Sequence, residues 1–389
     1  MIKKEAAHIR KQFKMDHDQL NLYDILNVYI MKETNEIYHF ERQPFAMLER
    51  EKQELYMGNF RKLLTGELDQ KLFELKFLEE AEEPTQVMLH QGLVTGDPEE
   101  WQDLMLMLVD KMLVDAKYEK DTVITFVRGQ YFRPTKARND EAEETGKDEV
   151  FAHPFILCSV NSTEQQRKTL LFDYVEREFK YNIMVDPIIK LSTPEQGFFY
   201  PSVTDNYSDV NRVLYCTGSA NNPNPHFIEQ VLNAERSVTA LEERSIFEDI
   251  VKEVAGEQID VATIAQVYEE IHQVIEDNAE EEEPPRLDYR DVERVLKASG
   301  VEDVTVEKVE RAFETIVDNK HYEMKASSVI PKYTTKSIKI DTKVASITIS
   351  PQDLRYVRQV NYQGKRCIMI EIEEDAVIEG FTLLTENLS

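Results

Sequence analysis

One stretch of the chain, residues 97–132, constrains the fold most, because an amphipathic helix is followed there by a strand. Asp97 is placed to cap a helix, Pro98 suits the first helical position, and Glu100 stands where a capping-box acid belongs. One apolar stripe then recurs at steps of three and four residues, which indicates a single buried helix face: Trp101, Leu104, Met105, Leu108, Val109, Met112 and Leu113. The next pattern, over residues 122–127, is a β-branched run typical of a strand.

Other segments extend this combination of helices and strands. The spacing of apolar residues predicts helices over residues 41–64 and 69–82, so that the first hundred residues are expected to be mostly helical. Further strand-like runs lie at residues 155–160, 170–179 and 197–200. We therefore predict an α+β fold in which a helical N-terminal region packs on a central mixed sheet, followed by a helical segment and a small C-terminal β-domain.

The second half of the chain has clear boundaries. A run of Asn and Pro at residues 221–225 breaks the chain, and six acids at residues 276–283 precede Pro284 and Pro285. Since 389 residues suffice for two or three cores, we predict four segments. These are a helical plus α+β core domain at 1–220, a helical connector with an acidic linker at 221–285, a helix pair at 286–330, and a small basic β-domain at 331–389. A meander or barrel of four or five strands is expected in the last segment.

The formal charge of −28 argues against a nucleic-acid-binding surface spread over the whole molecule. Residues 331–370 nevertheless carry eight basic and two acidic residues, a local charge of +6. This favours a protein or ribosome/RNA partner, unless the bases face the acidic middle of the same molecule. The predicted partner-binding residues are Lys336, Lys339, Lys343, Arg355, Arg358, Lys365 and Arg366. The helix pair carries more acids than bases, which disfavours sequence-specific DNA binding.

Motifs that carry chemistry are missing from the sequence. There is no phosphate-binding glycine loop, no nucleophile elbow and no HExxH, and no two of the eight histidines lie three to five residues apart. The three cysteines, Cys158, Cys216 and Cys367, form no CxxC pair, so we expect neither a disulfide framework nor a zinc site, and a cytoplasmic location. No apolar run reaches the length of a membrane span, and no cofactor is predicted.

The polar, turn-rich residues 197–211 are the best candidate for a catalytic site. Asp205 and Asp209 follow a buried strand, where paired carboxylates could hold Mg²⁺ or act as acid and base. Three basic residues of another loop, Arg133, Lys136 and Arg138, could approach and bind an anion. The favoured alternative is structural, because Asp and Ser are also the residues that such a turn and a helix cap require.

Several of these segments resemble one uncharacterised bacterial family, domain-of-unknown-function family 4317. The resemblance covers nearly the full length and rests on residues 60–66, 156–158, 197–201 with Asp205 and Asp209, 214–217, and 375–380. It implies a cytosolic bacterial protein and supplies no activity. Asn211 stands where the family pattern has a histidine, which counts against a catalytic or metal role for this loop.

Together these observations favour a non-enzymatic interaction or regulatory factor that binds a protein or ribosome/RNA partner through its basic β-domain. The alternative function is that of a metal-assisted phosphoester hydrolase, which would use Asp205 and Asp209 with Mg²⁺.

Overall fold

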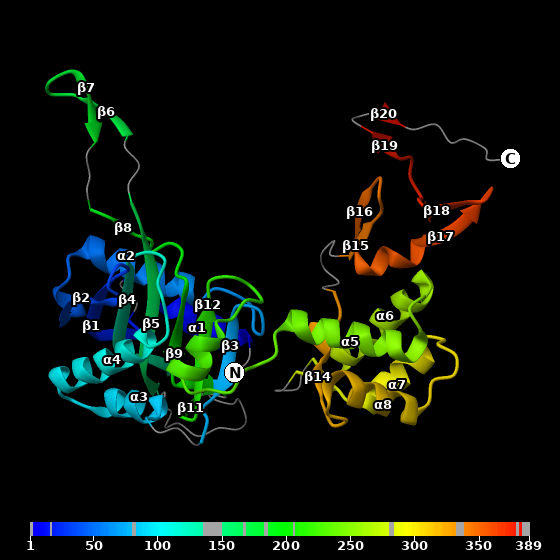
Figure 1. Cartoon of the computed structure of the whole chain (residues 1–389), viewed down its shortest axis with the longest axis horizontal. Helices are drawn as coiled ribbons and strands as arrows, with labels where there is room; N and C mark the ends of the chain where they lie inside the picture. Colours follow the sequence, from blue (N-terminus) through cyan, green and yellow to red (C-terminus); the bar gives the residue numbers. More distant parts are fainter. Residues whose placement is uncertain are drawn as a thin grey trace, which may run out of the picture. The chain divides into compact units, whose positions relative to one another are not determined.

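The computed structural model divides the chain into two compact units, Met1–Val238 and Thr239–Ser389 (Figure 1). It describes residues 3–15, 18–79, 83–134, 150–165, 169–182, 186–204, 207–279, 284–331, 338–378 and 381–382. The four-segment division predicted from the sequence stays a prediction. Within the described residues, no helix is both long enough and apolar enough to cross a membrane.

The first unit is built on an eight-stranded sheet whose described strand pairs are all antiparallel. The strand order is β2-β1-β4-β5-β9-β12-β3, and β8 pairs with the end of β5. The bounds are β1 Leu20–Met31, β2 Glu36–Pro44, β3 Leu72–Lys76, β4 Thr122–Pro134, β5 Val150–Glu164, β8 Ile188–Ile189, β9 Gln196–Tyr200 and β12 Arg212–Thr217. The α+β class is thus confirmed, and the sheet is antiparallel rather than mixed.

Helices cover both faces of this sheet. One core joins it to α3 (Thr85–Val94), α4 (Pro98–Leu113) and the π-helical turn η2 (Phe227–Val231). The other joins it to α1 (Lys3–Gln12) and α2 (Arg50–Leu63). Successive side chains of a strand point to opposite faces, so central strands such as β5 are apolar on both sides. Ile156 of β5 lies in the first core and Leu157 in the second, both fully buried.

The helix and strand with the strongest sequence signals form as predicted. The Asp97 carboxylate accepts a hydrogen bond from the Glu99 amide at 2.9 Å, Pro98 is the first helical residue, and Trp101 is fully buried. Glu100 does not close a capping box, because its carboxylate instead accepts from the Thr95 hydroxyl. Residues 122–127 open β4, one of the central strands.

The prediction of a mostly helical N-terminal region is wrong in three places, the first of which is β1 at residues 20–31. Residues 36–44 form β2 instead of the start of a helix, and α2 begins only at Arg50. Pro44 removes a helical donor, and β2 is an edge strand with mostly exposed side chains, so no alternating apolar pattern marks it. Residues 72–76 form β3, where pairing with β12 outweighs an ambiguous local pattern.

Two small hairpins of the first unit lie outside this sheet. β6 (Thr169–Asp173) pairs with β7 (Glu178–Asn182), and β10 (Ser202–Thr204) pairs with β11 (Tyr207–Asp209). Phe172 and Phe179 are register partners in the first hairpin and are both exposed.

The second unit has a helical core followed by hairpins. Its helices are α5 (Ala240–Ala255), α6 (Val261–Asp277), α7 (Tyr289–Ala298), α8 (Val306–Val317) and α9 (Ala326–Val329), with β13 (Arg286–Leu287) paired to β14 (Met324–Lys325). Two of these helices are capped by side chains, since Asp260 accepts from the Thr263 amide at 3.0 Å and Thr305 from the Lys308 amide at 3.3 Å. Gly300, with φ +82°, follows the end of α7 in a conformation that favours glycine.

The continuous meander or barrel expected at the C-terminus is not what the described residues form. They pair two by two, as β15 (Ile338–Asp341) with β16 (Ser346–Ile349), β17 (Val357–Tyr362) with β18 (Lys365–Ile370), and β19 (Val377–Ile378) with β20 (Phe381–Thr382). The 3₁₀ helix η3 (Pro351–Tyr356) and β17 contact α6, where Leu354 and Val357 are buried. Strand alternation can be read from sequence, whereas pairing beyond one hairpin depends on distant contacts.

Candidate functional site

Of the predicted carboxylate pair, Asp209 is the last residue of β11 in the β10–β11 hairpin. Asp205 lies outside the described residues. The Asp209 carboxylate accepts a hydrogen bond from the Asn211 amide at 2.9 Å and forms an ion pair of 3.4 Å with Arg212. Arg212 also pairs with Glu74 at 3.4 Å. A site made of both aspartates therefore stays a prediction, and the contacts of Asp209 are those of a structural turn residue.

Of the predicted anion-binding residues, Arg133 lies near the end of β4, while Lys136 and Arg138 lie outside the described residues. Close to Arg133, the ring of His153 stacks on Tyr131 with centroids 4.8 Å apart. Its Nδ1 lies 3.1 Å from the hydroxyl oxygen of Ser208, next to Asp209. This contact joins β5, the strand that pairs with the strand of Arg133, to the hairpin of Asp209, and an anion site of the three basic residues stays a prediction.

His153 was not singled out by sequence, since it belongs to no motif. Burial lowers its pKa below the ordinary 6.5, and the positive charges of Arg133 and His8 lower it further. Within the described residues, neither its Nε2 nor the buried hydroxyl of Tyr131 has a hydrogen-bond partner. A neutral ring is therefore favoured in the folded protein.

This burial predicts a loss of stability in mild acid. Below pH 6.5 the unfolded chain binds a proton at His153 that the folded chain does not, so stability is present above that pH and falls as the pH drops towards the lowered pKa. We expect His153→Gln to reduce the slope of unfolding free energy between pH 7 and pH 5, by at most about 1.4 kcal/mol per pH unit. Denaturant unfolding at several pH values checks this, with the exposed His39→Gln as control. An unchanged slope would contradict it.

The predicted partner-binding residues lie on the C-terminal hairpins, except Arg355, which belongs to η3, and Lys336, which is outside the described residues. Lys339 pairs with Asp341 at 3.2 Å and Arg358 with Glu371 at 3.6 Å. The remaining four are exposed and form no ion pair with any described residue: Lys343, Arg355, Lys365 and Arg366. The basic character ends at Ile370, because residues 371–375 hold four acids.

Three of the seven predicted partner-binding residues line one hollow of about 990 Å³, which lies between β17–β18 and the loop that joins α5 to α6. Arg355, Arg358 and Arg366 contribute the positive charge, and Glu257 and Asp260 lie across from them. A second hollow of about 770 Å³ includes Lys343 and Arg366. The guanidinium of Arg355 lies over the ring of Tyr356 at 5.0 Å, which limits its mobility.

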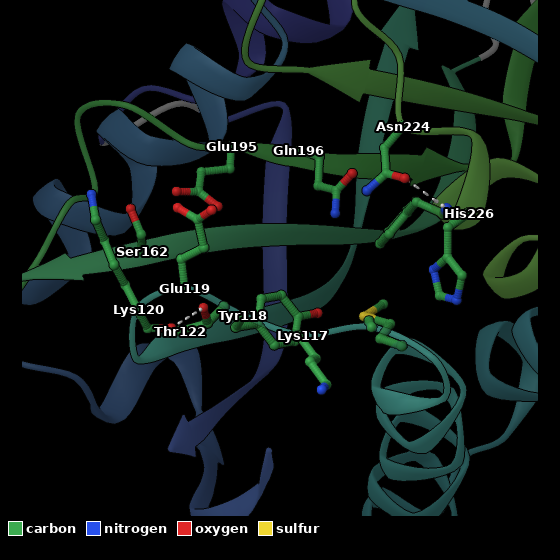
Figure 2. A pocket seen from close by; sticks show the side chains of 13 residues that line it. Lys117, Tyr118, Glu119, Lys120, Thr122, Ser162, Glu195, Gln196, Asn224 and His226 are labelled. Carbon is green, nitrogen blue, oxygen red and sulfur yellow. Dashed lines mark hydrogen bonds between the residues drawn. The ribbon is translucent and has the colours of Figure 1, made fainter. Parts of the chain in front are cut away.

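The first unit contains a separate pocket of about 390 Å³, shown in Figure 2. It lies where β4 and β9 begin and β5 ends, beside the loop that leads from α4 to β4. Its lining comes from five separate segments: Met112, Ala116, Lys117, Tyr118, Glu119, Lys120, Thr122, Ser162, Glu195, Gln196, Asn224, His226 and Phe227. No local pattern marks such a set, so sequence reasoning missed it.

Polar side chains converge in this pocket. The carboxylates of Glu119 and Glu195 point toward one another in Figure 2. Burial, followed by the nearby Cys158 and Glu195, raises the pKa of Tyr118 above its ordinary value. The Oε1 of Gln196 accepts from Tyr215 at 3.3 Å. The parts of the chain that the structure describes contain no group of three or more His, Cys, Asp or Glu side chains able to hold a metal.

The comparisons with known proteins agree with the resemblance seen in the sequence. The protein-family model described as Domain of unknown function (DUF4317) matches residues 1–381. The search of curated proteins found no match.

Proposed function

Because this chain belongs to the DUF4317 family, whose description assigns no activity, we propose a function from its basic surface: it is a non-enzymatic interaction factor that binds RNA, such as ribosomal RNA, through the hairpins of its second unit. The observation that carries the proposal is the hollow lined by Arg355, Arg358 and Arg366. A guanidinium presents a planar fork of donors that matches two phosphate oxygens.

The isolation and exposure of the β17–β18 hairpin also support the proposal that it binds a partner. β17–β18 is a two-stranded sheet within the described residues, and such an isolated hairpin is marginally stable unless it packs on something else. Val357 anchors one end on α6, while most of the hairpin remains exposed. A bound strand of RNA would cover this surface.

The acidic residues around the hollow support the proposal that RNA binding is selective. Glu257 and Asp260 border the hollow, and the whole chain carries a charge of −28. Negative charge around a small basic surface repels polyanions that do not fit the arginines, so it disfavours indiscriminate binding. The hydrolase alternative gains nothing from Asp209, whose carboxylate is already held by a backbone amide and Arg212.

The test is affinity purification of the tagged full chain from its native lysate, at low and high salt, with and without ribonuclease. We expect RNA to co-purify at low salt and to be lost at high salt. The triple variant Arg355→Gln/Arg358→Gln/Arg366→Gln should lose it. With isolated RNA, the slope of log affinity against log salt should shrink by roughly 2, since each lost phosphate contact contributes about 0.7.

A matched control removes three positive charges elsewhere in the same unit. Arg244, Lys252 and Arg294 lie on helices and form exposed or half-exposed ion pairs with acids of their own helix. Changing these three to Gln should leave RNA binding intact. Equal losses in the two triple variants, or no RNA at low salt, would contradict the proposal. A partner that resists ribonuclease and proves to be an acidic protein would replace RNA.

A further inference from the structure

We infer that α1 is held on the sheet at neutral pH and released from it in mild acid, so that this N-terminal helix acts as a pH-sensitive switch. The inference concerns the first unit and does not depend on the RNA surface. It starts from a cluster of buried polar side chains where α1 meets β4 and β5. The cluster consists of Gln12 on α1, Tyr131 on β4 and His153 on β5, which are 3%, 1% and 3% exposed.

Helix α1 covers this part of the sheet. The ring of Phe13, which directly follows α1, packs edge-on against the ring of Phe155, with centroids 5.7 Å apart. The ring of His8 lies 6.5 Å from that of Tyr131. Tyr131 and His153 are register partners, and alternate residues of a strand share a face, so His153 lies on the same face as Phe155. His153 therefore belongs to the face that α1 covers.

The hydrogen bonds of this cluster are incomplete. Nε2 of His153, the hydroxyl of Tyr131 and Oε1 of Gln12 are buried and have no hydrogen-bond partner among the described residues. Buried polar groups in proteins almost always have such a partner. Protonation would add a second N–H to the His153 ring, yet only Nδ1 has an acceptor, the Ser208 hydroxyl at 3.1 Å. A proton added to His153 is thus poorly accommodated while α1 is in place.

Positively charged groups near His153 act in the same direction. Burial, followed by the positive charges of Arg133 on β4 and His8 on α1, lowers the pKa of His153. Because His8 belongs to α1 itself, charge repulsion across the cluster acts directly between the helix and the sheet. A proton on His153 therefore weakens the attachment of α1.

The acidic groups near the cluster do not offset this effect. The Asp209 carboxylate, next to Ser208, is already held by an ion pair and a backbone amide. Glu5 on α1 is 4% exposed, and its charge acts on Tyr131, where burial, opposed by Arg133 and reinforced by Glu5, raises the pKa. Among the described residues, neither acid is one of the groups that shift the pKa of His153.

The direction of the switch follows from proton binding. Release of α1 exposes His153 to water, so its pKa returns towards the ordinary 6.5. Below pH 6.5 the released form binds a proton that the docked form does not, and a falling pH favours release. Between pH 7.5 and pH 5.5 this linkage raises the ratio of released to docked α1 by up to about tenfold. At neutral pH the buried side chains of Ile9 and Phe13, each 1% exposed, keep the helix docked.

Release of α1 remains local because no strand pairing depends on it. The helix precedes β1 in the chain, and the eight-stranded sheet is formed by strands that lie between residues 20 and 217. Chain ends open more readily than the central strands of a sheet. Trp101 lies in the core on the other face of the sheet and reports whether that core stays folded.

Hydrogen–deuterium exchange of the full chain at pH 7.5 and pH 5.5, followed by mass spectrometry, tests the inference. Dividing each exchange rate by the intrinsic rate at the same pH gives the protection of each segment. We expect the protection of α1 to fall about tenfold at pH 5.5, while β4, β5 and the fluorescence of Trp101 remain unchanged. An α1 without protection at pH 7.5, an unchanged α1, or an equal loss in α1 and in the sheet would overturn the inference.

Two variants show whether His153 is the group that responds. His153→Gln should abolish most of the pH dependence of α1 protection, because glutamine binds no proton in this range. If that variant leaves α1 unprotected at both pH values, Arg133→Gln decides, since it keeps the ring, removes one positive charge and should reduce the loss. The matched control is His90→Gln, an exposed residue of α3 in the same unit, which should keep the tenfold loss. A full tenfold loss in both His153→Gln and Arg133→Gln would contradict the role of His153.

Discussion

Asp24→Ala should lower the free energy of unfolding of the first unit by about 3 to 5 kcal/mol, because it leaves a buried guanidinium without its counter-charge. The Asp24 carboxylate, on β1, accepts from Nε of Arg128 at 2.9 Å and from Nη2 at 2.8 Å. The two side chains are only 9% and 11% exposed. Arg128 also donates to the carbonyl of Thr95 at 2.9 Å and lies over the ring of Trp101.

Trp101 provides the measurement. It is the only tryptophan and it belongs to the core of the first unit, so its fluorescence follows the unfolding of that unit in denaturant. The control is Glu54→Ala, which breaks the exposed Arg50–Glu54 pair and should cost less than about 1 kcal/mol. The prediction would be contradicted if Asp24→Ala cost no more free energy of unfolding than the control Glu54→Ala. The double variant Asp24→Leu/Arg128→Met should recover only part of the loss, because Arg42, which pairs with Asp24 at 3.3 Å, loses its partner as well.

Gly197→Ala should lower the same free energy by about 3 kcal/mol or more. Gly197 lies in β9 between β5 and β12, and an added Cβ would come within 2.1 Å of the Cys158 carbonyl oxygen. That oxygen belongs to the backbone of a central strand, so the clash can be relieved only by moving the sheet.

The control for this variant is another glycine of the same unit. Gly58 lies in the interior of α2, where an added Cβ meets nothing within 4 Å. Gly58→Ala should therefore stabilise the unit by about 0.5 to 1 kcal/mol, since alanine favours the helix. Tryptophan fluorescence in denaturant compares the two substitutions directly. Similar denaturant midpoints of unfolding for the two variants would contradict the prediction, because they would show that β9 has room for a Cβ at position 197.

The sequence predicts those parts of the fold that depend on neighbouring residues. The cap Asp97 lies two residues from the amide that it accepts from, so its helix was placed correctly. β2 was missed because its edge position leaves it with mostly exposed side chains, and β3 because five residues are too few to show a clear period. β3 is set by pairing with the distant β12, whereas β2 pairs with the neighbouring β1 across a short turn.

The same distinction holds for the candidate sites. The three arginines that line the hollow of the second unit could be predicted because they lie within twelve residues of one another, from Arg355 to Arg366. The pocket of the first unit could not, because Glu119 and Glu195 are brought together only when the sheet has formed. Asp205 and Asp209 were conspicuous in the sequence, yet Asp209 serves the local turn.

The pairing of β3 with β12 also sets when the first unit can complete its fold during synthesis on the ribosome. β3 ends at Lys76 and β12 begins at Arg212. β3 therefore cannot pair until the ribosome has made β12, much later in the sequence. At about 5 to 20 residues per second this delay is roughly 7 to 27 s. Throughout it, Leu72, Phe73 and Leu75 lack the β12 neighbours that cover them in the finished protein, so we expect this segment of the nascent chain to be prone to aggregation.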